Sequence, residues 1–129
     1  MTPEPDQLAF ELSNDLAEMP LLAEHLEQFC LRHGIDGDVL SQLNLALDEI
    51  VLHIISYGYG PDRGAQRIRV ALAHDGASLT ARIEDDAPPF DPLEREDPNL
   101  GMHLVKTLVD EVSYTRERER NVLVIRKQT

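Results

Sequence analysis

The segment LALDEIVLHIISYGYG, residues 45–60, carries three ionisable side chains within an apolar helical pattern: Asp48, Glu49 and His53. Glu49 and His53 are four residues apart, so on a helix they share one face. Charged groups on a core helix are costly unless they face something polar. A glutamate in such a place suits a general base, and an imidazole can bind a metal ion. We therefore expect this helix face to border a polar site.

Two further polar clusters interrupt apolar elements. In IEDDAPPFDP, residues 83–92, Asp85 stands at the end of a predicted strand, where a partly desolvated carboxylate suits the donor edge of a base or an amine. In NLGMHLVKTLVDEV, residues 99–112, Gly101 falls in the first turn of a predicted helix, whose free N–H groups and dipole suit a phosphate. The sequence has no GxxxxGK[ST] motif. Together the three clusters predict a nucleotide pocket without a P-loop.

Each of these residues also has a structural interpretation that the sequence leaves open. Glu49 could be a solvated helix residue, His53 a polar residue at a pocket rim, and Gly101 a glycine that eases helix packing. Asp85 and Asp86 could form a turn pair; we assign Asp85 to the pocket and Asp86 to the turn. Glu49 and His53 alone would supply only half of a zinc site, so a dedicated metalloenzyme is disfavoured.

The first half of the chain predicts one strand and two helices. The strand covers residues 7–13, and the first helix begins near Pro20. The second helix is capped by Asp36 or Asp38 and keeps helical period to Ile54, before the turn YGYGPDRG. The polar cluster described first therefore lies near the end of the second helix.

The second half predicts two β-hairpins. Strands at 66–74 and 78–86 are joined by the turn DGA, and VSYTRE pairs with NVLVIRK, with TRERER as the solvated end of that hairpin. Between the hairpins lie a loop at 86–98, which holds four of the eight prolines, and a helix from about Asn99 to Val109. Loops of this length inside a compact domain are usually functional.

This order of elements predicts an α+β fold, a two-layer α/β sandwich with a mixed, mainly antiparallel sheet and helices on one face. We expect a single domain over residues 1–129. Asp and Glu outnumber Lys and Arg by 24 to 12, for a net charge of −12, which argues against a direct nucleic-acid partner. The single cysteine, Cys30, is predicted to be a reduced thiol in the core. With no apolar run of about 20 residues and no signal-peptide pattern, we expect a cytoplasmic protein without a membrane partner.

The chain resembles the anti-sigma-factor serine kinases of the GHKL ATPase superfamily, which share the Bergerat ATP-binding fold with sensor histidine kinases. LNLALDEIVLHIISYGY is similar to the N box of that family, IEDDAPPFDP to its first glycine box, and NLGMHLVKTLVDEVSY to its second. The three motifs follow in the family's order, and the resemblance extends over nearly the whole chain. It implies a Bergerat fold, ATP and Mg²⁺ as cofactors, and regulation of transcription by partner switching.

The resemblance also implies roles for individual residues. Glu49 would activate the attacking hydroxyl group, and Asp85 would accept a hydrogen bond from the adenine amino group. His53 stands at the position of the asparagine that ligates magnesium, and Ala87 replaces a glycine that lies against adenine. Residues 86–99 would form the ATP lid. The residues expected beside the phosphates are Asn99, Leu100, Gly101 and Met102.

Two functions follow from these motifs. The first is an ATP-dependent serine/threonine kinase that binds a sigma factor, phosphorylates an anti-anti-sigma (antagonist) protein, or does both. The second is a nucleotide-binding module without phosphoryl transfer, which regulates its partner by occupancy alone. His53 motivates the second function, because Mg²⁺ prefers oxygen ligands to imidazole nitrogen. A homodimer through the first strand is also possible if that strand lies at a sheet edge.

Overall fold

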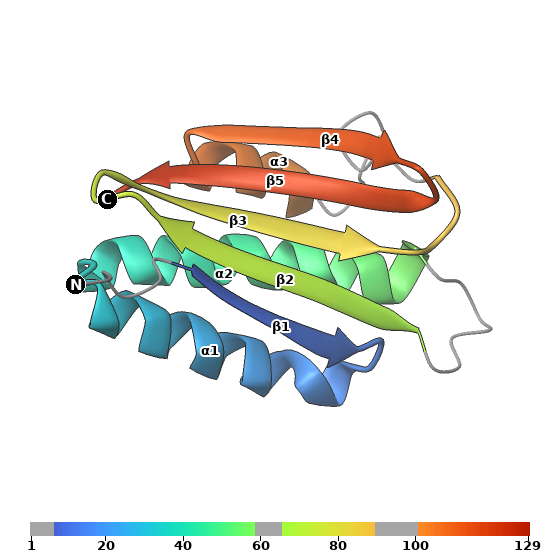
Figure 1. The fold of residues 1–129 in the computed structure, drawn as a ribbon, viewed down its shortest axis with the longest axis horizontal. Coiled ribbons are helices and arrows are strands. Elements are labelled where there is room, and N and C mark those ends of the chain that lie inside the picture. Colours follow the sequence, from blue (N-terminus) through green and yellow to red (C-terminus); the bar gives the residue numbers. More distant parts are fainter. Residues whose placement is uncertain (1–6, 59–65, 90–100) are drawn as a thin grey trace, which may run out of the picture.

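The computed structural model describes residues 7–58, 66–89 and 101–129, and it has two layers. A five-stranded sheet forms one layer, and the helices pack against one of its faces (Figure 1). This is the predicted α+β sandwich.

The sheet has the strand order β1-β2-β3-β5-β4, and every neighbouring pair is antiparallel. Strand β5 lies between β3 and β4, so the second hairpin is joined to the first through its later strand. Strand β1 lies at one edge and β4 at the other. The strands are β1 (Gln7–Ser13), β2 (Arg67–His74), β3 (Ser78–Asp85), β4 (Glu111–Glu117) and β5 (Arg120–Gln128).

The helical layer contains three α-helices and two short helical turns in the described residues. They are the 3-10 turn η1 (Leu16–Glu18), α1 (Met19–Arg32), α2 (Gly37–His53), the π-helical turn η2 (Ile54–Gly58) and α3 (Gly101–Leu108). Pro20 lies in the first turn of α1, as predicted. Of the two predicted caps of α2, Asp36 is the one that acts, because its Oδ1 accepts a hydrogen bond from Asp38 N at 3.2 Å.

One hydrophobic core fills the space between the sheet and the helices. Alternate residues of each strand point toward the helices, as their period of two requires. The side chain of Cys30 is fully buried in this core, as expected. Other fully buried members of the core are Leu12, Leu22, Leu26, Phe29, Leu43, Leu47, Ile68, Leu79 and Ile125.

Helix α2 is the central helix of this core. By length and composition, Gly37–Ser56 is the one described helix that could cross a membrane, with a mean hydropathy of 1.3. The core helix of a globular domain meets the same criterion, and six side chains of α2 are buried inside this domain. Its apolar character is therefore accounted for by packing within the domain.

Candidate functional site

The elements that carry Glu49, His53 and Asp85 end at the same end of the sheet. In Figure 1 the C-terminal ends of α2 and β3 lie at the same end of the structure. Strand β2 begins there as well, since Ile68 pairs with Asp85. Helix α2 ends at His53 and continues as a π-helical turn, a feature often found at functional sites.

Asp85 is the last residue of β3, and its side chain is only 4% exposed. Its Oδ1 accepts two hydrogen bonds, from the backbone N–H of Ala87 and from the side-chain amide of Asn121, both at 2.9 Å. Its Oδ2 has no hydrogen-bond partner among the described residues. One oxygen of this carboxylate is therefore fixed, while the other remains available as an acceptor.

The surroundings of Asp85 act on its ionisation in opposite directions. Burial raises the pKa of Asp85 above its ordinary value, and this is the largest effect. The hydrogen bonds from Asn121 and Ala87 lower the pKa and partly offset the burial. Asp86 raises it through its negative charge, and Arg116 lowers it through its positive charge. A buried carboxylate with a raised pKa is typical of functional sites.

Two acidic residues of α2 lie near the end of that helix. Asp48 and Glu49 are both half-buried, and neither has a hydrogen bond or ion pair within the part of the chain that the structure describes. Burial raises the pKa of Asp48, and the neighbouring charge of Glu49 raises it further. Within the described residues, no cation therefore compensates the charges of Asp48 and Glu49.

His53 is buried, with 8% of its surface exposed, at the last position of α2. It lies one helical turn after Glu49, as predicted. The described residues contain no group of three or more histidine, cysteine, aspartate or glutamate side chains that could hold a metal ion. His53 and Glu49 are therefore not part of a complete protein-only metal site in that portion of the chain.

The glycine-box residues divide between described and undescribed segments. Ala87 is buried and donates its N–H to Asp85 Oδ1, so the structure places it next to that carboxylate. Gly101 is the first residue of α3, and Met102 is buried in the core. Asn99 and Leu100 lie outside the described residues, as does most of the predicted lid at 86–99.

Three residues of the β4–β5 hairpin reach this site and were not predicted: Tyr114, Arg116 and Asn121. Asn121 is 5% exposed and stands opposite Asp85 in the β3–β5 register. The sequence offered one signal, a polar residue at the start of the apolar strand NVLVIRK. Arg116 belongs to the run predicted to be only a solvated hairpin end, yet its Nη1 donates a hydrogen bond to the Ala87 carbonyl at 2.8 Å.

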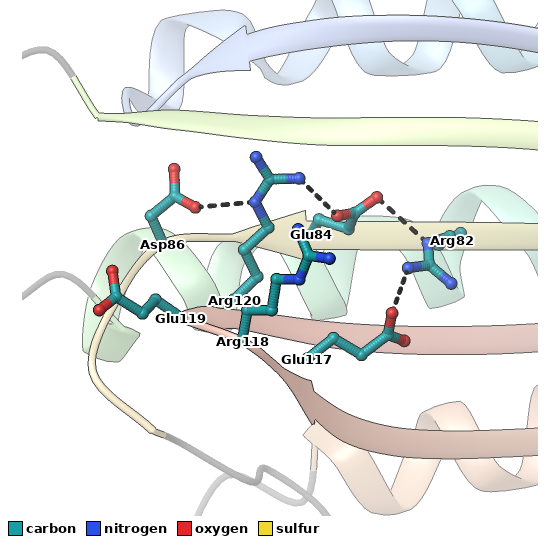
Figure 2. A pocket seen from close by; sticks show the side chains of 7 residues that line it. All are labelled: Arg82, Glu84, Asp86, Glu117, Arg118, Glu119 and Arg120. Carbon is teal, nitrogen blue, oxygen red and sulfur yellow. Dashed lines mark hydrogen bonds and ion pairs between the residues drawn. The ribbon is translucent and has the colours of Figure 1, made fainter.

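The opposite face of the same sheet end carries a chain of ion pairs. Figure 2 shows Asp86, Arg120, Glu84, Arg82 and Glu117 linked in that order, with distances of 3.5, 3.5, 3.1 and 3.1 Å. Asp86 is also bound by both terminal nitrogens of Arg69, at 2.9 and 3.3 Å. Asp86, predicted to belong to the turn, directly follows the last residue of β3. Its pKa is lowered, chiefly by the hydrogen bonds from Arg69.

These side chains line a hollow of about 770 Å³, whose lining contains three arginines and four carboxylates. A lining with more acidic than basic groups repels phosphate. Apart from Glu84, at 19%, and Arg69, at 25%, the side chains of these pairs are at least 40% exposed, so each pair contributes roughly 0–1 kcal/mol to stability. The hollow is therefore a poor candidate for a nucleotide site.

The fold and the site define a two-layer α/β domain with a buried carboxylate at a strand end, at the same end of the sheet as the end of α2. The chain belongs to the histidine kinase-like ATPase domain family, whose sequence profile matches residues 12–127. Membership in this family supports an ATP-binding regulatory role. The search of curated proteins returned no match to this chain.

Two solved structures show the same fold. One contains the RsbU and RsbW domains of Rv1364c from Mycobacterium tuberculosis, with 18% identity, a TM-score of 0.72, and coverage of 98% of this chain and 32% of that one. The other is the histidine kinase domain of the EL346 blue-light activated histidine kinase from Erythrobacter litoralis, with 17% identity, a TM-score of 0.62, and coverage of 86% and 59%. The chain spans about a third of the first structure's length and about three fifths of the second's.

Proposed function

We propose that this chain binds ATP at the end of the sheet where β3 ends beside α2, and that the nucleotide controls its binding to a partner protein. The observation that carries the proposal is the buried carboxylate of Asp85, with Oδ1 held by two donors and Oδ2 unpartnered among the described residues. An acceptor placed in this way suits the exocyclic amino group of adenine. The family match supports the same ligand.

The phosphates would lie at the start of α3. That helix begins at Gly101, and the first N–H groups of a helix have no partner within it and carry the positive end of its dipole. Asn99, Leu100, Gly101 and Met102 are the residues that we assign to the phosphates, with residues 86–99 as the lid. Ala87 would lie against the base.

Magnesium fits the described residues less well than adenine does. His53 offers an imidazole nitrogen where Mg²⁺ prefers oxygen, and no cluster of three ligands accompanies it in the described segments. We therefore derive no step through this ion. ATP binding at this site would depend mainly on the base and phosphate contacts of the chain itself.

The chain would act either as a serine kinase or as a binding module. In the kinase, Glu49 would accept the proton of a serine hydroxyl on an antagonist protein. In the module, ATP would shift the population of a partner-binding conformation. The partner in either case would be a sigma factor, its antagonist protein, or both, as the motif resemblance to the anti-sigma-factor kinases implies. A cytoplasmic location and a homodimer through the edge strand β1 accompany this proposal.

Calorimetric titration with ATP and ADP, each with and without magnesium, tests nucleotide binding. We expect saturable binding of ATP by the wild-type protein and loss of that binding in Asp85→Asn. The substitution puts an amide nitrogen, which is a donor, at the position of the acceptor Oδ2. Glu84→Gln is the matched control, because Glu84 is adjacent to Asp85 but pairs with Arg82 and Arg120 on the opposite face. The ATP affinity of this control should stay within about threefold of wild type, since the substitution weakens only ion pairs on the face away from the site. No ATP binding by the wild-type protein would refute the proposal.

Transfer of labelled phosphate from ATP to an antagonist protein separates the two modes of action. Transfer by the wild-type protein supports the kinase, and binding without transfer supports the module. His53→Asn restores the amide that the family uses at this position. A rise in transfer in this variant would indicate that His53 weakens catalysis, and a fall would indicate that the imidazole itself takes part.

A further inference from the structure

The turn that leaves β3 is held by a side chain that the proposed function does not use. Asn121 Nδ2 lies 2.9 Å from Asp85 Oδ1, 3.0 Å from the Pro88 carbonyl oxygen and 3.2 Å from the Ala87 carbonyl oxygen. All three partners are acceptors, and the side chain of Asn121 is almost fully buried. One side-chain amide thus contacts the carboxylate and both residues that begin the turn toward the loop.

The orientation of this amide is determined by the partners of its oxygen, Oδ1. Asn121 Oδ1 accepts a hydrogen bond from the hydroxyl group of Tyr114 and another from Arg116 Nη1, the latter at 3.1 Å. A flipped amide would place Nδ2 against Arg116, which can only donate, and Oδ1 against the carboxylate and two carbonyl oxygens, which can only accept. Tyr114 and Arg116 therefore fix the direction in which Asn121 donates.

This fixed donor decides which part of Asp85 remains available. With Asn121 and Ala87 N both on Oδ1, the carboxylate cannot rotate without losing two buried hydrogen bonds. Losing a hydrogen bond to a buried charged group is costly, so Oδ2 stays in place as the open acceptor. An acceptor at that point favours an amino group on the base and opposes a keto oxygen.

We propose that Asn121 is a positioning residue that sets the base selectivity of the nucleotide site, by holding Asp85 so that its Oδ2 accepts from a 6-amino purine and rejects a 6-keto purine. The inference rests on the proposed ATP site. It goes beyond that site because it assigns the selectivity to the β4–β5 hairpin, which supplies Asn121, Tyr114 and Arg116.

The test compares the affinities for ATP and for inosine triphosphate, which differs from ATP in having a keto oxygen in place of the 6-amino group. We expect the wild-type protein to bind ATP at least about tenfold more tightly than inosine triphosphate. The reason is that ATP makes one hydrogen bond to the Asp85 carboxylate, whereas the keto oxygen is repelled by it. In Asn121→Leu, which has the same branched shape but no donor, this ratio should fall to about threefold or less. The ratio of ATP to ADP affinity should stay the same, because Asn121 is not assigned to the phosphates.

Two further variants control for a purely structural role of the hairpin. Glu117→Gln changes the same hairpin at an exposed ion pair with Arg82, on the opposite face, and should keep the wild-type selectivity ratio. The double variant Tyr114→Phe/Arg116→Leu retains Asn121 but removes the two donors that orient its amide, and its ratio should fall toward that of Asn121→Leu. Folding of each variant is judged by circular dichroism and a cooperative melting transition. If Asn121→Leu does not fold, the double variant tests the role of Asn121 in its place.

The outcomes separate this inference from the proposed function. A folded Asn121→Leu, or a folded double variant in its place, with the wild-type ratio would overturn the role of Asn121 and leave ATP binding intact. A wild-type protein that binds neither triphosphate would overturn the proposed function, and the positioning role with it. Loss of selectivity in Asn121→Leu together with an unchanged ratio in Glu117→Gln would establish the role.

Discussion

The carboxylate of Asp85 and the side-chain amide of Asn121 form a buried hydrogen bond of 2.9 Å between residues that are 36 positions apart in the chain. It joins the last residue of β3 to the second residue of β5, at the end of the sheet where α2 also ends. Removing either partner would leave the other buried without its bond, at a cost of about 1–3 kcal/mol. The same bond holds the candidate base-binding carboxylate in one orientation.

Asp85→Asn should separate stability from function. The variant keeps an acceptor for Asn121 and Ala87 N but removes a buried charge whose pKa is raised by burial. We expect the melting temperature at pH 7 to be equal to that of wild type or up to about 4 °C higher, equivalent to roughly 1 kcal/mol, while ATP binding is lost. A lower melting temperature would mean that the charge stabilises the fold.

The stability difference between Asp85→Asn and wild type should also depend on pH. Because the folded-state pKa of Asp85 lies above its ordinary value of 3.8, the folded protein binds this proton more tightly than the unfolded chain. Falling pH therefore favours the folded wild-type protein through this group, and the advantage of the variant shrinks as pH falls through the folded-state pKa toward 3.8. Urea unfolding of both proteins at a series of pH values measures this. A difference that grows on acidification would contradict the raised pKa.

Glu49→Gln should abolish phosphoryl transfer, if wild type has it, without weakening ATP binding. The substitution removes a proposed proton acceptor, and general-base catalysis is typically worth 100-fold or more, so we expect a loss of at least about 100-fold in transfer rate. It also removes the negative charge that raises the pKa of Asp48, so the fold should be no less stable than wild type. Wild-type transfer by a folded Glu49→Gln would exclude Glu49 as the base.

Cys30 should be unreactive in the folded protein. The thiol is fully buried, and burial raises its pKa to about 11, so almost no thiolate is present at pH 8. Iodoacetamide should leave the native protein unmodified over a period in which the urea-unfolded chain gains one adduct, because Cys30 is the only cysteine. Mass spectrometry measures the adduct in the native and in the urea-unfolded protein. Rapid modification of the native protein would show that the α1 side of the core opens readily.

Gly76→Ala should destabilise the fold by about 1 kcal/mol, because Gly76 has a φ of +93° in the turn between β2 and β3. No atom lies within 4 Å of the position that a Cβ would take, so the cost is conformational only. Gly37→Ala is the matched control, since its site is equally open and its φ is not positive. That control should be neutral or stabilising by about 0.4–1 kcal/mol, as measured by urea unfolding. Equal stabilities of the two variants would contradict the argument.

The order of the elements could be predicted because each depends on nearby residues. The period-two pattern of RIRVALAH and the helical period of residues 39–54 are local properties, and β2 and α2 appear where these patterns lie. Asp36 could not be separated from Asp38 as the cap of α2, since both types suit that position. The π-helical turn after His53 was also unforeseen, because no residue type in IISYG specifies it.

The sequence by itself determined an α+β sandwich, the carboxylate at the end of β3 and the polar face at the end of α2, because hydrophobic period and residue type specify them locally. Only the tertiary structure decided that β5 inserts between β3 and β4 and so brings Asn121 opposite Asp85. It also placed Asp86 among arginines on the other face. Strand pairing and register depend on how whole elements pack over the core, and no short segment contains that information.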